Sequence, residues 1–170
     1  PFDEQQLEDD FQQLIDYLSQ PDSDYFLFRD FQSRNIMIRE EKVYFIDYQG
    51  GRKGALHYDI ASLLYDGKAA IPPAIRKMLL DAYLDELEKY ISVDRTDFTS
   101  YFDAFVLIRI LQALGTYGYR GYYEKKSHFL LSIPYAIENI RYLLKEMTLP
   151  IEIPMLRSVL QQLTETDIVQ

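Results

Sequence analysis

The sequence predicts a mainly α-helical protein with one small β-hairpin, which is an α+β fold class. Apolar residues recur every three or four positions through most of the chain, the spacing of amphipathic helices. Two short β-favouring runs are joined by a charged turn, which is typical of a hairpin. The chain has 170 residues, of which 48% are hydrophobic and 26% charged. A chain of this length buries roughly 70% of its extended-chain surface on folding, so one globular domain is expected.

The N-terminal part of the chain combines a helix with short strands. Apolar residues from position 7 to position 18 have helical spacing, with Asp3 placed to cap the helix and Pro21 to stop it. The β-favouring runs that follow cover residues 25–28, 35–38 and 43–47. We expect the last two to pair as the hairpin, because the sequence Arg-Glu-Glu-Lys between them suits a turn.

The remainder of the chain has a helical pattern, and no further strand is expected. Glycines in segment 50–54 favour a mobile connection, since the Gly-Lys-Ser/Thr of a phosphate-cradling loop is missing. Helices are expected at residues 58–65, 73–90, 97–117, 132–146 and 155–163. Tyr and Gly alternate in segment 116–123, which favours a flexible aromatic connection. We expect one domain at 1–148 and a C-terminal extension, a linker followed by a helix, at 149–170.

Charge and composition exclude several classes of protein. With 18 Lys and Arg against 27 Asp and Glu, the net charge of −9 excludes a general nucleic-acid binder. Without Cys, the chain has no disulfide, thiolate zinc site or Cys nucleophile. No apolar run approaches the roughly 20 residues of a membrane span, and the acidic N-terminal residues do not suit a signal peptide. A cytoplasmic protein without membrane contact is expected, and the missing initial Met suggests a piece of a longer one.

Three oxygen-bearing side chains flank the predicted hairpin. The hairpin brings Asp47 beside Asn35, and Asp30 lies a short loop away. Because Mg²⁺ prefers oxygen ligands, a carboxylate and an amide at the hairpin base predict a magnesium site next to a candidate base. Phosphoryl transfer needs mainly a positioned metal, charge neutralisation and an aimed hydroxyl. The alternative is that these residues only cap turns, as Asp and Asn often do.

The same residues carry a resemblance to a known family. The pattern Asp30-x-x-x-x-Asn35, followed by a hairpin and Ile-Asp-Tyr-Gln-Gly, resembles the catalytic loop and metal-binding segment of the kinase superfamily. The closer similarity is to aminoglycoside phosphotransferases and choline kinases. Within that branch, segments 28–38, 44–54 and 58–65 resemble bacterial cell-wall amino-sugar kinases, which phosphorylate the anomeric hydroxyl of N-acetylmuramic acid or N-acetylglucosamine. The resemblance covers about residues 25–144.

The resemblance implies a role for each matching residue. Asp30 would be the catalytic base that orients the acceptor hydroxyl. Asn35 and Asp47 would hold Mg²⁺ with ATP as the phosphoryl donor. Asp59 would hold the catalytic loop by hydrogen bonds, whereas a routine helix N-cap is the alternative for this residue.

Two positions depart from the family pattern. Phe28 stands where the family usually has His, and Gln32 stands where protein kinases carry a phosphate-contacting Lys. The γ-phosphate charge would then be met by Arg34, Arg52 or Lys53.

The resemblance also implies what else the protein needs. Only 29 residues precede Asp30, too few for a nucleotide-binding lobe, so we expect the C-terminal lobe of a protein-kinase-like fold with the N-terminal ATP lobe absent. The missing lobe of the parent chain is then the expected partner, and the fragment alone is expected to be inactive. The exposed apolar face near the hairpin would favour a dimer.

Three functions remain open. The first is transfer of the γ-phosphoryl of Mg-ATP to the anomeric hydroxyl of a cell-wall amino sugar. The second is a catalytically inert pseudokinase or binding module, and the third is a choline- or aminoglycoside-directed kinase, since a negative protein suits cationic acceptors. Arg109 and Arg120 would bind a sugar carboxylate such as a lactyl group, or form salt bridges, the commoner role of Arg. His57 and His128 are expected to be structural.

Overall fold

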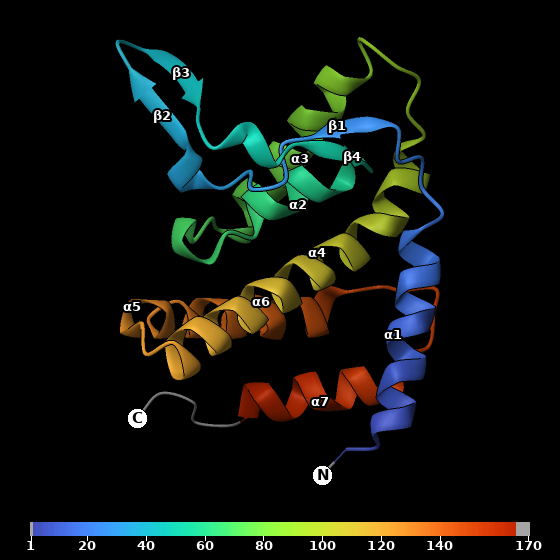
Figure 1. Ribbon diagram of the computed structural model, residues 1–170. Helices are drawn as coiled ribbons and strands as arrows, with labels where there is room; N and C mark the ends of the chain where they lie inside the picture. Colours follow the sequence, from blue (N-terminus) through green and yellow to red (C-terminus); the bar gives the residue numbers. More distant parts are fainter. Residues whose placement is uncertain (1, 166–170) are drawn as a thin grey trace.

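The computed structural model describes residues 2–165, which form a helical bundle that carries a small β unit at one end (Figure 1). The helices are α1 (Glu4–Leu18), α2 (His57–Leu64), α3 (Pro73–Leu87), α4 (Arg95–Gly118), α5 (Ser127–Leu130), α6 (Ile133–Glu146) and α7 (Pro154–Glu165). The strands are β1 (Tyr25–Leu27), β2 (Ile36–Arg39), β3 (Lys42–Phe45) and β4 (Arg52–Gly54), and short helical turns lie at Ser33–Asn35, Tyr48–Gly50, Gly67–Ala69 and Tyr119–Tyr123. The predicted class, mainly α with a small β component, is confirmed.

Helix α4 is the centre of the bundle. It runs diagonally between the β unit and the lower helices (Figure 1) and contacts α1, α2 and α6. Its buried side includes Phe98, Phe105 and Leu107, as the apolar stripe predicts in part. Within the described residues, Arg95–Tyr123 is the one helix long and apolar enough to cross a membrane by length and composition. In this fold it is a core helix, since its apolar side chains pack against neighbouring helices.

Helix α7 joins the same core. Leu156 and Leu160 are buried between α7 and its neighbours α1 and α6. The buried carboxylate of Asp10 on α1 accepts a hydrogen bond from the backbone N–H of Leu156 at 2.7 Å, in the first turn of α7. The bundle therefore continues past residue 148 into the expected extension, of which residues 166–170 lie outside the described part.

The hairpin prediction is confirmed. Strands β2 and β3 pair antiparallel from Ile36 opposite Phe45 to Arg39 opposite Lys42. The turn residues Glu40 and Glu41 both have positive φ, of 50° and 63°. That conformation matches the twist of the two strands, so the turn fixes the register that places the hairpin base.

The expectation of a mobile glycine segment without a strand is wrong. Strand β4 pairs antiparallel with β1, with Tyr25 opposite Gly54. A Cβ added at Gly54 would lie 2.3 Å from Leu27 Cδ1, and one at Gly51 would lie 2.6 Å from Phe26 Cε2. These glycines therefore let two short strands approach closely, which the sequence pattern alone could not distinguish from mobility.

The expected flexible connection at 116–123 is also wrong. Helix α4 continues to Gly118 and then through one π-helical turn, Tyr119–Tyr123, to Glu124. Gly121 is buried under Leu130 of the short helix α5, where an added Cβ would lie 2.2 Å from Leu130 Cδ2. The close contact with α5 holds the segment in place. The sequence did not indicate helix α5, so this contact could not be predicted.

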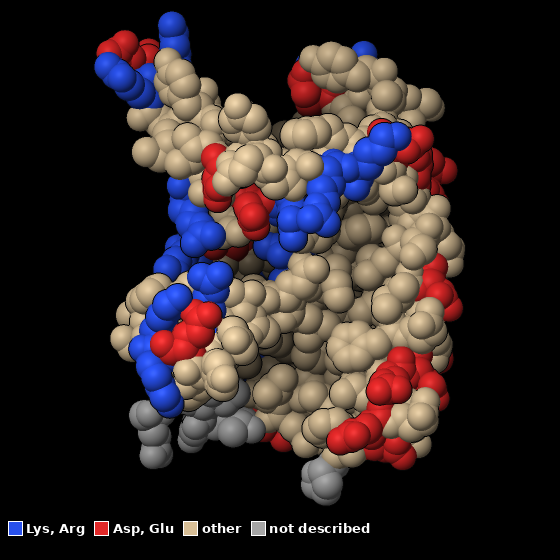
Figure 2. Space-filling model, in the orientation of Figure 1, with Lys and Arg blue, Asp and Glu red and all other residues tan. Residues whose placement is uncertain are grey.

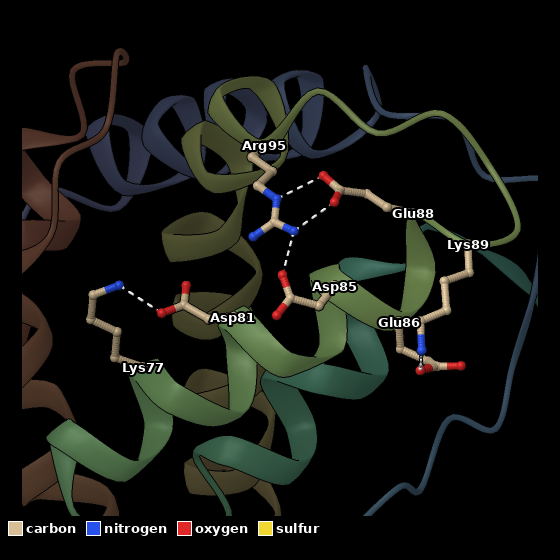
Figure 3. Close-up of polar contacts among 7 residues, drawn as sticks. All are labelled: Lys77, Asp81, Asp85, Glu86, Glu88, Lys89 and Arg95. Carbon is tan, nitrogen blue, oxygen red and sulfur yellow. Dashed lines mark hydrogen bonds and ion pairs between the residues drawn. The ribbon is translucent and has the colours of Figure 1, made fainter.

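Several ion pairs lie on the exposed side of α3 (Figure 3). The Arg95 guanidinium donates to Glu88 at 2.7 and 2.6 Å and to Asp85 at 2.6 Å, which links the end of α3 to the start of α4. Lys77 pairs with Asp81 one turn further along. Because these charges are solvent-exposed and screened, they orient the connection while the core supplies most of the stability.

His57 is a core residue. Its side chain is 6% exposed, and its ring stacks on Phe98 and Phe105 with centroid separations of 3.9 and 4.8 Å. Burial lowers the pKa of His57 from 6.5 to about 4. Between about pH 4 and pH 6.5, the imidazole is therefore neutral in the folded protein and protonated in the unfolded chain.

We predict that His57 makes stability rise with pH. The unfolded chain binds the proton below pH 6.5 and the folded one only below about pH 4. The free energy of unfolding therefore increases through this window and reaches its full value above it, by up to about 3 kcal/mol. Urea unfolding of His57→Phe should show this part of the pH dependence removed. The exposed control His128→Gln should keep it, and an equal slope in His57→Phe and the original chain would contradict the assignment.

Candidate functional site

A loop between β1 and β2 is held at two points, by an acid in the first turn of helix α2 and by an acid just after this helix. In the first turn of α2, Asp59 accepts hydrogen bonds from the backbone N–H of Phe28 at 2.5 Å and of Arg29 at 2.8 Å. Just after α2, Asp66 accepts from the backbone N–H and hydroxyl of Ser33 at 3.0 and 2.5 Å. Helix α2 therefore fixes the loop on both sides of Asp30.

The two acids differ in how far the sequence predicts them. Asp59 lies inside α2 rather than at its N-cap, so its carboxylate is available to the loop, as the resemblance expects. Burial raises its pKa, while the two backbone hydrogen bonds and Arg109 act in the opposite direction. Asp66 was missed, because an acid between a helix end and Gly67 has no spacing that points to a loop far away in sequence.

The loop carries backbone strain next to Asp30. Arg29 has φ of 76°, an uncommon conformation for a residue other than Gly. Such a conformation costs about 1–3 kcal/mol and persists where the surroundings hold it. The hydrogen bond from its N–H to Asp59 supplies that restraint, so the position of Asp30 depends on α2.

Asp30, Asn35 and Asp47 come from the loop, the hairpin base and the segment after β3. The buried Asn35 donates from Nδ2 to the backbone oxygen of Asp30 at 2.8 Å, which leaves its Oδ1 for another partner. The backbone N–H of Ile46 donates to the oxygen of Asn35 at 3.0 Å. Asp47 therefore follows directly on the residue bonded to Asn35. Its carboxylate is exposed and accepts from Gln49 Nε2 at 2.5 Å.

These residues could hold a hard cation. One carboxylate and one amide oxygen form the small protein donor set typical of Mg²⁺, which completes its shell with water and phosphate oxygens. In residues 2–165, no group of three or more His, Asp and Glu side chains gathers as a metal site. A transition-metal centre is therefore not supported in this part of the chain.

A cavity of about 340 Å³ lies against the loop. Asp30, Gln32 and Arg34 line it on the loop side, and Arg120 and Tyr117 line it on the helical side. This volume is within the range that binds small molecules. The structure thus brings Asp30 together with three of the expected contact residues.

Arg52 and Lys53 do not line this cavity. Both are exposed on β4, and Lys53 forms an ion pair with Asp24 at 2.8 Å. Phe28, which stands where the family usually has His, packs against Phe31 and Phe45 with centroid separations of 5.7 and 6.2 Å. An aromatic cluster therefore joins the loop to the hairpin at this point.

Arg109 also lines the cavity, and its expected salt bridge is wrong. Its guanidinium donates to Gln112 Oε1 at 2.9 Å, to Ser62 Oγ at 3.0 Å and to the Tyr58 hydroxyl at 3.3 Å. Within the described chain, no carboxylate lies within ion-pair distance of it. The guanidinium therefore lies beside the cavity and acts on Asp59 only from beyond ion-pair distance.

We predict that the two acids protect different backbone amides. In Asp59→Ala, the amides of Phe28 and Arg29 lose a charged acceptor and should exchange with deuterium roughly 10- to 100-fold faster. In Asp66→Ala, the amide of Ser33 should respond instead. Hydrogen exchange read by NMR measures both variants, and equal protection in either variant and the original chain would contradict this account of the loop.

The comparison with known families agrees with this geometry. Residues 2–92, which include α1, all four strands, the loop, α2 and α3, match the phosphotransferase enzyme family (APH). No curated protein matches the sequence significantly. Since the family match spans more than half of the sequence, the chain belongs to the phosphotransferase enzyme family.

Proposed function

We propose that this chain is the acceptor-binding lobe of a small-molecule kinase. It would transfer the γ-phosphoryl group of Mg-ATP to the anomeric hydroxyl of a cell-wall N-acetylated amino sugar in the bacterial cytoplasm. The observation that supports the proposal best is the position of Asp30, on a loop held by α2 at the wall of a cavity of about 340 Å³. Family membership supports phosphoryl transfer.

Each polar residue of the site has a distinct part in this proposal. Asp30 accepts a hydrogen bond from the acceptor hydroxyl, orients its oxygen and takes its proton as the bond to phosphorus forms. Asn35 and Asp47 would hold Mg²⁺, which neutralises phosphate charge when bound. Asp59 and Asp66 position the loop without touching the acceptor.

The surface of the β unit suggests where the nucleotide lobe binds. Phe26 on β1, Ile38 on β2 and Tyr48 after β3 are 67%, 76% and 67% exposed, and most apolar residues of the hairpin are exposed as well. Apolar surface of this kind usually marks an interface. We place the N-terminal lobe of the parent chain here, with Arg52 and Lys53 of β4 at its edge, and expect copies of the isolated lobe to pair through the same face.

We predict that Asp30→Asn lowers phosphoryl transfer by roughly 10²–10⁴-fold, because the amide cannot take the hydroxyl proton. The assay follows labelled γ-phosphate from Mg-ATP to N-acetylmuramic acid, N-acetylglucosamine, choline or an aminoglycoside, with the chain extended upstream through its nucleotide lobe. Asp81→Asn, on the exposed side of α3, is the matched control. Transfer to no acceptor by the folded protein would favour the pseudokinase or binding module. The aromatic cluster at Phe28, where the family usually has His, supports that alternative.

Asp47→Ala should weaken the affinity for Mg-ATP at least about tenfold, because one of the two protein ligands of the metal is lost. Calorimetry on the extended chain measures it, with ATP in excess EDTA as the metal-free reference. Glu41→Ala removes an exposed acid at the tip of the same hairpin and serves as the control. Unchanged affinity in Asp47→Ala would show that Asp47 is not a metal ligand.

A further inference from the structure

The cavity beside Asp30 has the opposite charge to the rest of the protein. The chain carries a net charge of −9, yet the cations that line the cavity, Arg34, Lys68, Arg109 and Arg120, outnumber its acids, Asp30 and Asp66. On the face shown in Figure 2, Lys and Arg side chains gather on the hairpin side and around the hollow below it, with some Asp and Glu side chains among them and a further group of acids along α1. A cationic cavity in an acidic protein needs a local explanation.

Acidic side chains of the described residues do not neutralise these cavity cations through ion pairs. None of the four cations has a carboxylate within ion-pair distance in residues 2–165. Asp66 is engaged by Ser33 and by the backbone N–H of Lys68. The positive charge at the cavity wall is therefore available to a ligand.

Two buried polar atoms at the same cavity also lack partners. Arg109 Nε forms no hydrogen bond, although the other guanidinium nitrogens do. Ser132 is 1% exposed, lines the cavity and leaves its Oγ without a hydrogen bond. Buried polar groups are normally paired, so Arg109 and Ser132 each keep an unused hydrogen-bonding atom beside the cavity.

The cavity arginines come from both of its walls. Arg34 and Arg109 line the cavity together with Tyr117. Burial and Asp66 raise the pKa of Tyr117, and the two arginines act in the opposite direction. Arg120 lies over the Phe129 ring, 5.4 Å from its centroid. Arg34 comes from the loop, Arg109 from α4 and Arg120 from the π-helical turn, so the two walls of the cavity present guanidinium groups together.

We propose that this cavity binds an acceptor that carries a carboxylate, which Arg34, Arg109 and Arg120 recognise through charge-assisted hydrogen bonds. Guanidinium groups suit carboxylates because their planar donors bind both oxygens. That the ligand is a phosphoryl acceptor rests on the proposed function, whereas the recognition of an acidic ligand rests on the cavity itself. Choline and aminoglycosides carry positive charge, which the arginines repel, so this proposal excludes both.

The test compares two sugars that differ in the lactyl ether on one hydroxyl, and the salt dependence and the arginine variants separate the effect of its carboxylate from that of its size. N-acetylmuramic acid carries a lactyl carboxylate and N-acetylglucosamine does not. Calorimetry with the 170-residue chain should give roughly tenfold or tighter binding of the acid, and this preference should shrink with added salt. Arg34→Gln and Arg120→Gln change exposed side chains, and each should lower the acid-to-neutral affinity ratio several-fold, toward one. Arg39→Gln, exposed at the hairpin tip, should leave the ratio unchanged.

Several outcomes would overturn the proposal. Equal affinities for the two sugars, or an acid preference that survives in both arginine variants, would remove the carboxylate site. Displacement of the acid by inorganic phosphate at equal concentration would identify a phosphate site instead. Acid binding by this chain without any transfer in the extended protein would keep the inference and reject the proposed function. Transfer to both sugars without a preference for the acid would keep the proposed function and reject the carboxylate site.

Discussion

The hydrogen bonds from the loop to the acids at the two ends of α2 determine the geometry of the rest of the site. Asp59 holds the strained Arg29, and Asp66 holds Ser33. Helix α2 is itself fixed by α4, the central helix of the core. The position of Asp30 over the cavity therefore follows from core packing through two carboxylates, and a small rotation of α2 would displace it. Precise placement of this kind matters for phosphoryl transfer, which relies mainly on positioning and charge.

Local charge and overall charge give opposite indications about the acceptor. A net charge of −9 favours cationic ligands at long range. The cavity, however, is lined by arginines that have no carboxylate within ion-pair distance in residues 2–165. Charges at contact distance in a partly desolvated cavity outweigh screened charges on a distant surface. A group of acids lies along α1 (Figure 2), while the cations that line the cavity outnumber its two acids. The acceptor class that we propose therefore rests on the cavity rather than on composition.

The sequence predicts the elements of this fold better than their contacts. Helical spacing predicts the bounds of six helices to within a few residues, namely α1, α2, α3, α4, α6 and α7. The charged turn predicts the hairpin. The spacing from Asp30 to Asn35 led to the loop because both residues belong to one local motif. Strand β4 was missed because its glycines serve a contact with β1 that sequence alone does not reveal. Asp66 was missed for the same reason, since its partner Ser33 lies far away in the chain. Arg109 was a candidate from the sequence, but its hydrogen bond to the distant Ser62 could not be predicted.

The most direct test of the central claim asks whether one ligand contacts both walls of the cavity. We would add N-acetylglucosamine to the ¹⁵N-labelled chain and follow the backbone amide shifts by NMR, because this sugar carries no carboxylate and its binding does not depend on the arginines. The account predicts shifts in loop residues 29–35 and at the end of α4, residues 112–120, with residues 39–42 at the hairpin tip unchanged. Shifts in only one wall, or only on α1 and α7, would contradict it.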